Sequence, residues 1–363
     1  MSGNRRIALA GGGTAGHVTS GLAIMIEYRR AFAGAELWFI GCPGGFEEML
    51  VPAHGFPLIT IPGAPFARQK IGGKLLAVRE LARGTQAARS VLQKCSVGFV
   101  IGLGGYASAG SVLAARSLGI PAIIHEANVS AGFANRLVSR AAARVCTGWE
   151  ATRSAFRGRD VVVTGNPIVP EIAAGKHAGG LDGPRRILIT GGSEGSGFLN
   201  RNVPPLLARI QATGIALDVV HQAGLGAEES VGRDYAAAGI AARVEGFIHE
   251  IAAAYRCAQF VISSAGALTL AELAAMGLPA LLVPSNAVSA NHQHNNATSW
   301  AEAVGGLSIS EDDWNAEKLA TSLASLLNDP AALAEQSRRA RALARPDAAR
   351  AVINVCEALI HAA

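Results

Sequence analysis

Two apolar runs, one near the start of the chain and one just past its middle, each lead directly into a glycine-rich turn. Residues 7–10 precede the turn at 11–16, and residues 186–190 precede the turn at 191–195. Strands of parallel sheets are buried on both faces, so they read as continuous apolar runs, and a glycine turn after such a strand opens a helix. The repeat therefore predicts two α/β units built on the same strand–turn–helix step.

The length of the chain agrees with two units. At 363 residues it exceeds the size of about 250–300 residues at which single cores stop growing. We expect a first domain at 1–166, a linker at 167–183 that is rich in glycine, and a second domain at 184–346. A last helix at 347–362 is expected to cross back onto the first domain. Further strands are expected at 37–40, 97–101, 122–124, 161–163, 216–220, 242–245, 260–262 and 280–283.

Composition excludes several classes of protein. Half of the residues are hydrophobic and 16% are charged, which is typical of a globular chain. The longest apolar stretch, at 273–284, is shorter than the roughly 20 residues of a membrane span. We expect no signal peptide, and the five cysteines lack metal-type spacing, which favours reduced thiols in the cytoplasm. With 5% aromatic residues and no binding motif, nucleic acid is not an expected partner.

One segment concentrates positive charge. Residues 68–94 carry seven basic side chains and one acid, Glu80, interleaved with leucines and valines. Two hypotheses are open: a solvated helix face, or a surface that faces anionic lipid headgroups.

The first glycine turn has the pattern of an anion site. Gly11, Gly13 and Gly16 follow a strand and precede a helix, so backbone N–H groups and the helix N-terminus would face a ligand. A dinucleotide enzyme would need an acid at the end of the second strand, but Glu36 stands before that strand. His17 begins the helix, and beside an anion loop it is a candidate general base or hydrogen-bond donor.

Other polar or glycine-rich segments follow strands in both halves, where ligands of doubly wound sheets bind. In the first half these are 102–108, with Tyr106, and 125–128, with Glu126 and Asn128. In the second half, Ser193 lies in a phosphate-type loop, and the small residues at 264–267 would expose N–H groups at a helix start. The histidines at 292 and 294 lack a carboxylate or cysteine partner, so amide contacts to sugar hydroxyls are favoured over a metal.

Together these motifs resemble the MurG family, the UDP-N-acetylglucosamine transferases that make the second lipid intermediate of peptidoglycan. The resemblance covers essentially the whole chain, and its motifs stand in family order. They are the glycine loop ending in Gly16-His17, Gly104-Gly105-Tyr106, His125-Glu126-x-Asn128, Gly165-Asn166-Pro167, Gly191-Gly192-Ser193, Ser264-x-Gly266-Ala267-Leu268-Thr269 with Glu272, and His292-Gln293-x-x-Asn296-Ala297.

The resemblance implies two Rossmann-like domains facing across a cleft, the B-type glycosyltransferase fold. In the second domain it implies a site for UDP-N-acetylglucosamine, with Glu272 on the ribose and Phe247 and Ile251 near the uracil. The implied diphosphate contacts are Ser193, Ala267, Leu268 and Thr269, and the implied sugar contacts are His292 and Gln293. In the first domain it implies an acceptor site at Gly13, Thr14, Ala15, Gly16, Gly104, Gly105 and Glu126.

The implied reaction is an inverting displacement that forms a β-1,4 bond to an undecaprenyl-diphosphate-linked muramyl-pentapeptide. His17 is the implied base, with Tyr106 and Asn128 beside it. A helix N-terminus would stabilise the leaving group, so no cofactor and no tightly held metal are expected, although stimulation by a divalent cation is compatible with this site. The expected location is the cytoplasm, peripheral on the inner face of the cell membrane.

Four residues depart from the family pattern at ligand-facing edges: Glu194, Val169, Ala265 and Ala127. They leave two alternatives open. One is a related transferase that uses a UDP-sugar on a secondary-metabolite acceptor, and the other is a non-catalytic nucleotide-sugar binder.

Overall fold

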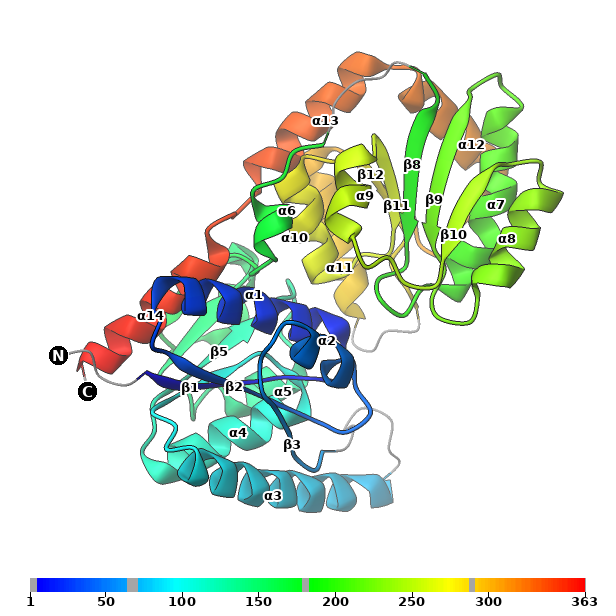
Figure 1. Cartoon of the computed structure of the whole chain (residues 1–363). Helices are drawn as coiled ribbons and strands as arrows, with labels where there is room; N and C mark the ends of the chain where they lie inside the picture. The colour runs from blue at the N-terminus through cyan, green and yellow to red at the C-terminus, as the bar shows by residue number, and fades with distance from the viewer. Residues whose placement is uncertain (1–4, 64–70, 178–182, 287–290, 363) are drawn as a thin grey trace. The chain divides into compact units, whose positions relative to one another are not determined.

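The computed structural model describes residues 5–63, 71–177, 183–286 and 291–362. The chain divides into two compact units (Figure 1): residues 1–170 together with 346–363, and residues 171–345. The boundary falls within the segment that the sequence predicts as a linker, of which 178–182 lie outside the described residues. Both units are parallel α/β sheets, as the repeated strand–turn–helix pattern predicts.

The first unit is built on a sheet of seven described strands in the order β3-β2-β1-β4-β5-β6-β7, all parallel. The strands are β1 (Arg6–Ala10), β2 (Glu36–Gly41), β3 (Leu58–Thr60), β4 (Phe99–Gly102), β5 (Ala122–Glu126), β6 (Arg144–Thr147) and β7 (Val161–Val163). The helices are α1 (Ala15–Ala31), α2 (Glu47–Ala53), α3 (Ile71–Lys94), α4 (Gly105–Leu118), α5 (Phe133–Val138), the 3-10 helix η1 (Glu150–Phe156) and α14 (Ala348–Ala362).

Alternation along β1 sends side chains to both faces of this sheet. Ile7 and Leu9 enter a core closed by α1 and α14, whereas Ala8 and Ala10 enter a core closed by α3 and α4. The C-terminal helix α14 therefore belongs to the first unit, where Figure 1 shows it beside α1.

The second unit repeats the plan with six described strands in the order β10-β9-β8-β11-β12-β13. They are β8 (Arg185–Thr190), β9 (Leu217–Gln222), β10 (Ala242–Glu245), β11 (Phe260–Ser263), β12 (Ala280–Leu282) and β13 (Leu307–Ser308). The helices are α6 (Pro170–Ala173) at the boundary, α7 (Gly197–Gln211), α8 (Glu228–Ala237), α9 (Ile251–Cys257), α10 (Ala267–Met276), α11 (His292–Val304), α12 (Ala316–Leu327) and α13 (Pro330–Ala342).

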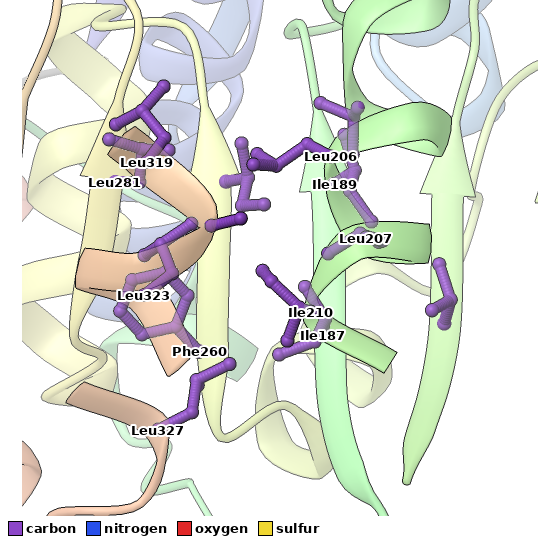
Figure 2. Close-up of a cluster of buried hydrophobic side chains, with 14 of the residues drawn as sticks. Ile187, Ile189, Leu206, Leu207, Ile210, Phe260, Leu281, Leu319, Leu323 and Leu327 are labelled. Carbon is purple, nitrogen blue, oxygen red and sulfur yellow. The ribbon is translucent and has the colours of Figure 1, made fainter. Parts of the chain in front are cut away.

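Leucines and isoleucines of α7 and α12 form the core on one face of this sheet (Figure 2). The labelled side chains come from both helices and from strands β8, β11 and β12: Ile187, Ile189, Leu206, Leu207, Ile210, Phe260, Leu281, Leu319, Leu323 and Leu327. The side chains on this face are buried and apolar, so the face supports the sheet without offering a polar site.

Each sheet reverses its winding once. The chain runs outward from β1 through β2 to β3 and returns to place β4 on the other side of β1; in the second unit it does the same around β8 and β11. Loops that follow the two central strands of such a sheet diverge, which leaves room for a ligand. In the first unit these are the loops at 11–14 and 103–104, and in the second unit those at 191–196 and 264–266.

Three of the described strands were not predicted from the sequence. β3 has three residues and β13 has two, so neither gives a recognisable apolar run. β6 reads Arg-Val-Cys-Thr, with only two apolar residues in sequence.

Candidate functional site

The two central loops of the first unit pack against each other through backbone atoms. A Cβ on Gly105 (φ +80°) would lie 2.5 Å from the carbonyl oxygen of Gly12, and one on Gly104 (φ +103°) would lie 2.8 Å from Nε2 of His17. Positive φ values already favour glycine at both positions. The sequence predicts that this glycine pair contacts the acceptor. In the structure Gly105 lies against Gly12 of the first loop, and Gly104 lies against His17.

His17 is held in one orientation. It lies in the first turn of α1, whose N-cap Thr14 accepts its backbone N–H, and its Nδ1 lies 2.9 Å from the carbonyl oxygen of Gly12. A carbonyl only accepts, so Nδ1 must carry the proton. In the neutral ring the lone pair is then on Nε2, the atom beside Gly104. This tautomer suits a general base.

Glu126 organises the loop that follows β5. Glu126 is 3% exposed, and its carboxylate accepts from Asn128 N (3.0 Å), Asn128 Nδ2 (3.2 Å), Gly132 N (2.9 Å) and Asn135 Nδ2 (2.9 Å). Both oxygens are therefore used inside the protein. The predicted contact of Glu126 with the acceptor stays a prediction, and its observed hydrogen bonds fix the backbone that carries Asn128.

The neighbouring His125 and Asn166 join this loop to the Gly165-Asn166-Pro167 motif. His125 Nε2 lies 2.9 Å from Gly165 O, and Asn166 Nδ2 donates to Ala127 O at 3.0 Å. Burial lowers the pKa of His125, so the ring is neutral and bonds the carbonyl as a donor. Ala127 thus contributes its backbone carbonyl to this junction.

Sequence reasoning missed Glu47, the first residue of α2. Its side chain is fully buried, Oε1 accepts from Cys42 N at 2.9 Å, and Oε2 has no hydrogen-bond partner among the described residues. A Cβ on Gly12 would lie 2.4 Å from Oε1, so this carboxylate packs directly on the first glycine loop. Glu36, the acid considered from sequence, forms an ion pair with Arg6 at the opposite end of β2.

In the second unit the glycine loop after β8 makes a tight turn. Gly192 N donates to Thr190 Oγ1 at 3.1 Å, and a Cβ on Gly195 (φ +74°) would lie 2.2 Å from Ala223 O. Ser193 is half-buried in this turn, whereas the side chain of Glu194 is exposed. Solvation of Glu194 limits the repulsion that its charge would exert on an anion in the loop.

The winding of the second sheet reverses between β8 and β11, and this place is its switch point. On the far side of it, α10 begins at a residue that has no side chain to cap the helix. Gly266 is the N-cap, and no acid stands in the first turn that contains Ala267, Leu268 and Thr269. The first N–H groups and the positive end of the helix dipole suit an anion. The predicted diphosphate residues therefore flank the same switch point as the glycine loop.

Two side chains from α11 fix the turn before α10. Gln293 Oε1 accepts from Ala265 N (3.2 Å) and Ser285 N (2.8 Å), and the buried Asn296 donates from Nδ2 to Ala265 O at 3.1 Å. Ala265 is fully buried and held at both backbone atoms. Any contact of Gln293 with a sugar must come from Nε2, because Oε1 is engaged.

The two nearby histidines differ in their surroundings. His292 is the first residue of α11, and its Nδ1 is buried with no hydrogen-bond partner among the described residues. His294 Nε2 lies 3.0 Å from Asn286 Oδ1. Over the described ranges, no group of three His, Cys, Asp or Glu side chains is arranged to hold a metal ion.

Glu272, the predicted ribose ligand, has a partner that the sequence did not reveal. Tyr255 of α9 donates from its hydroxyl to Oε2 of Glu272 at 2.9 Å. Burial raises the pKa of Glu272 to about 7, although the Tyr255 hydrogen bond lowers it. A titratable group with such a shift beside an anion loop is typical of a functional site.

The predicted uracil residues lie after β10. Phe247 makes an edge-to-face contact with His249, with ring centroids 5.1 Å apart, and Ile251 begins α9. The loop is tied to β9 because Gly224 N donates to Gly246 O (3.1 Å) and Ile248 N donates to Gln222 Oε1 (2.8 Å). Phe247 is therefore held between two anchored neighbours.

Family models match both units. The N-terminal domain of glycosyltransferase family 28 matches residues 7–147, and its C-terminal domain matches residues 186–352. Among the described residues, no helix is long and apolar enough to cross a membrane.

Curated relatives cover nearly the whole chain. A protein of Stutzerimonas stutzeri (strain A1501) named UDP-N-acetylglucosamine–N-acetylmuramyl-(pentapeptide) pyrophosphoryl-undecaprenol N-acetylglucosamine transferase is 37% identical over 356 residues, which is 98% of this chain and 99% of the relative. A protein with the same name from Anaeromyxobacter sp. (strain Fw109-5) is 36% identical over 357 residues, which is 98% of this chain and 94% of the relative.

Solved structures agree with these relatives. The crystal structure of Acinetobacter baumannii MurG matches with a TM-score of 0.76 and 30% identity, covering 97% of this chain and 98% of that one. A UDP-N-acetylglucosamine 2-epimerase matches with a TM-score of 0.71 at 13% identity, covering 99% of this chain and 96% of that one, a likeness of fold alone.

Proposed function

The chain belongs to the MurG family within glycosyltransferase family 28, and from this premise we propose that it transfers N-acetylglucosamine from UDP-N-acetylglucosamine to undecaprenyl-diphosphate-linked muramyl-pentapeptide, which forms lipid II. The observation that carries the proposal is full-length similarity to transferases of that name. Because the matched regions include the switch-point loops of both units, the similarity extends beyond the shared fold.

For the donor, we propose a site in the second unit. The N-terminus of α10 and the loop around Ser193 supply backbone N–H groups suited to a diphosphate. Glu272 accepts from the ribose hydroxyls at Oε1, because Oε2 already accepts from Tyr255. Phe247 contacts the uracil, together with Ile251.

For the acceptor, we propose that the first unit supplies the base. An acceptor hydroxyl oxygen attacks the anomeric carbon, the bond from that carbon to the phosphate oxygen breaks, and UDP leaves with the electron pair. The hydroxyl proton passes to Nε2 of His17, whose proton on Nδ1 is retained by the bond to Gly12 O. Attack from the face opposite UDP inverts the anomeric configuration and gives a β-1,4 linkage.

We further propose that the reaction needs no resident metal. The leaving diphosphate gains negative charge as the bond breaks, and the helix dipole and N–H groups of α10 offset that charge. A divalent cation can add to this effect by accompanying the diphosphate. Because the acceptor is anchored in lipid, the enzyme is proposed to work in the cytoplasm, peripheral on the inner face of the cell membrane.

The direct test is transfer of labelled N-acetylglucosamine from UDP to the lipid-linked muramyl-pentapeptide in detergent or vesicles. We expect a β-1,4-linked lipid product and release of one UDP for each transfer. Absence of transfer, together with turnover on an unrelated acceptor, would instead assign a diverted transferase. Tight UDP binding without turnover on any acceptor would assign a nucleotide-sugar binder.

A further inference from the structure

Gln222, the last residue of β9, lies between two loops of the second unit and is 5% exposed. Nε2 donates to Gly192 O at 2.7 Å and more weakly to Thr190 Oγ1 at 3.4 Å. Oε1 accepts from Ile248 N at 2.8 Å. One buried side chain thus joins the glycine loop after β8 to the loop after β10.

Backbone contacts around Gln222 strengthen the same junction. The glycine loop packs on the residue after Gln222, where a Cβ on Gly195 would lie 2.2 Å from Ala223 O. On the other side, Ala223 N donates to Glu245 O at 2.8 Å and Gly224 N to Gly246 O at 3.1 Å. The segment after β9 therefore contacts both loops, and Gln222 is the side chain that bonds to each.

The junction requires a side chain that both donates and accepts. Gly192 O only accepts and Ile248 N only donates, so the side chain between them must offer a donor and an acceptor at once. A glutamine does so without charge, whereas an ionised glutamate has acceptors alone. Leaving either buried backbone group unpaired would cost roughly 1–3 kcal/mol.

We infer that Gln222 is a positioning residue that sets the glycine loop and the Phe247 loop in one fixed relation, so that the diphosphate and the base of the donor meet a single preformed surface. This inference rests on the proposed function for the identity of the ligand. Preformed loops bind a ligand more tightly because they lose less conformational entropy on binding. Gln222 acts through the two loops and need not touch the donor.

The test is Gln222→Glu with UDP as the probe, measured by calorimetry from pH 5.5 to 8. At pH 8 the ionised carboxylate of the Gln222→Glu variant cannot donate to Gly192 O, and we expect UDP affinity at least tenfold weaker than that of the unchanged protein. Burial raises the pKa of such a carboxyl, so protonation within this range restores one donor. The affinity ratio of the two proteins should therefore narrow to within about threefold at pH 5.5.

Because the ratio compares the UDP affinities of the two proteins at the same pH, titrations that both proteins share cancel. UDP and Glu272 titrate alike in both proteins. His221, the neighbour of Gln222, does not change charge in this range because burial lowers its pKa to about 4. Glu245, at the end of the adjacent β10, and Glu228 near Gly246 are present in both proteins.

Two further variants separate positioning from general loss of stability. Gln222→Met removes donor and acceptor together, so its loss of affinity should be the same at every pH. Gln259→Glu is the matched control, because Gln259 is also a buried glutamine that bonds to a backbone N–H, Arg186 N at 2.9 Å, but at the amino end of the same sheet. Its UDP affinity should equal that of the unchanged protein throughout.

The outcomes distinguish the inference from its premise. If the unchanged protein does not bind UDP, the proposed donor site fails. If it binds UDP and the Gln222→Glu ratio is constant with pH, or Gln222→Met binds normally, the positioning role is overturned. Thermal unfolding recorded on the same samples verifies folding, and the pH series on one folded Gln222→Glu sample decides the question if Gln222→Met does not fold.

Discussion

His17 combines a fixed tautomer with a location at the first glycine loop. Its Nδ1 lies 2.9 Å from Gly12 O and 3.3 Å from Thr14 Oγ1, so the ring is held at one edge. The opposite edge carries Nε2, where Gly104 leaves the space that a side chain would fill. Orientation and tautomer together are what a base needs before its pKa matters.

We therefore expect His17→Ala to lower kcat by about 10²–10⁴-fold, the range typical of a lost general base. UDP affinity should not change, because the donor residues lie in the other unit. Steady-state kinetics and calorimetry check the two halves of this prediction. His54→Ala, at an exposed histidine of the same unit, is the control and should keep full kcat; normal turnover by His17→Ala would remove His17 from the mechanism.

Glu272 should make donor binding depend on pH. Its carboxyl has a pKa near 7 in the free protein, and ribose hydroxyls donate to the ionised form. Affinity for UDP-N-acetylglucosamine should be highest above pH 7 and fall by up to about tenfold per unit below it. Calorimetry over pH 5.5–8.5 measures this, and Glu272→Gln should bind more weakly with little pH dependence. An identical profile for the two proteins would contradict the ribose role.

The same carboxyl should affect stability with a definite sign. The folded-state pKa of about 7 lies above the ordinary 4.5, so the contribution of Glu272 to stability is greatest below pH 4.5 and is lost as pH rises through 7. Glu272→Gln should consequently melt higher than the unchanged protein at pH 8 and similarly near pH 4.5. A stabilised variant that binds the donor poorly would show a site that trades stability for function.

At the residue scale, the sequence indicated candidate functional side chains but not the residues that position them. Glycine patterns and strand ends pointed to His17 and Ser193 as candidates, and the family resemblance implied Glu272. Tyr255 and Gln222 were missed because their partners are brought near only by the packing of separate strands and helices. No local pattern marks a tyrosine on α9 as the partner of a carboxyl on α10.

Among the elements, the loops after β1 and β4 depend on each other's backbone. Gly105→Ala would place a Cβ 2.5 Å from Gly12 O at a φ of +80°, so the loops must separate and His17 must shift. We expect kcat to fall at least tenfold while UDP affinity is retained, because a 1 Å misplacement of a catalytic group is costly. Kinetics with both substrates provides the measurement.

The matched control for this change is Gly119→Ala at the C-cap of α4. Gly119 has a similar φ of +72°, but no atom lies within 4 Å of its added Cβ. It carries the backbone strain without the collision, so it should lose some stability and keep its kcat. Equal loss of kcat in both variants would attribute the Gly105 effect to strain alone.

Substitutions on helix α3 can test the hypothesis that its basic residues face anionic lipid headgroups. Within the described side chains, Arg79 and Arg83 are exposed beside the exposed Val78, while Lys70 lies outside the described residues. Each basic residue near an anionic surface contributes about 1 kcal/mol, so Arg79→Gln with Arg83→Gln should reduce binding to phosphatidylserine vesicles by about 30-fold at low salt. Arg153→Gln with Arg157→Gln is a surface control on η1 and its C-cap. Equal vesicle binding by both pairs would return α3 to a solvated face.

Sequence patterns predicted the long central strands because burial on both faces makes them continuous apolar runs. Edge strands carry less of that signal. β3 and β13 lie at the ends of their sheets and are half-exposed, so two or three residues suffice and local composition does not mark them. The site was not affected by these omissions, since its residues follow other strands, among them β1, β4, β5, β8, β9, β10 and β11.

For the whole molecule, the sequence repeat predicted both sheets, while the division of the chain between units depends on a long-range return. Residues 346–363 belong with the first unit, and Val352 and Ile353 of α14 share the core of Ile7 and Leu9. An amphipathic helix at the end of the chain indicates a buried face. We expected this helix to return to the first domain, and the contacts that hold α14 there join residues more than 300 positions apart.

One ion pair joins the two ends of that unit. Arg5 donates to Glu357 from Nε at 2.9 Å and from Nη2 at 2.8 Å, and the buried Tyr28 donates its hydroxyl to the same carboxylate. Side chains of Arg5 and Glu357 are 20% and 13% exposed, so solvent screens this pair less than a surface pair. Hydrogen bonds to a charged partner contribute about 1.5–3 kcal/mol.

Glu357→Gln should therefore lower the free energy of unfolding by roughly 1–3 kcal/mol at pH 7. Burial by itself would raise the pKa of Glu357, but the bonds from Arg5 and Tyr28 hold it below 4.5. This stabilisation is present above the ordinary pKa and lost as pH falls through the lower folded value. Urea unfolding at pH 7 and pH 3 checks the sign: the gap between variant and unchanged protein should shrink in acid. Glu335→Gln, at an exposed pair with Arg338, should change the free energy of unfolding little. An equal effect of the two variants would show that the Glu357 pair does not stabilise the packing of α14 in any special way.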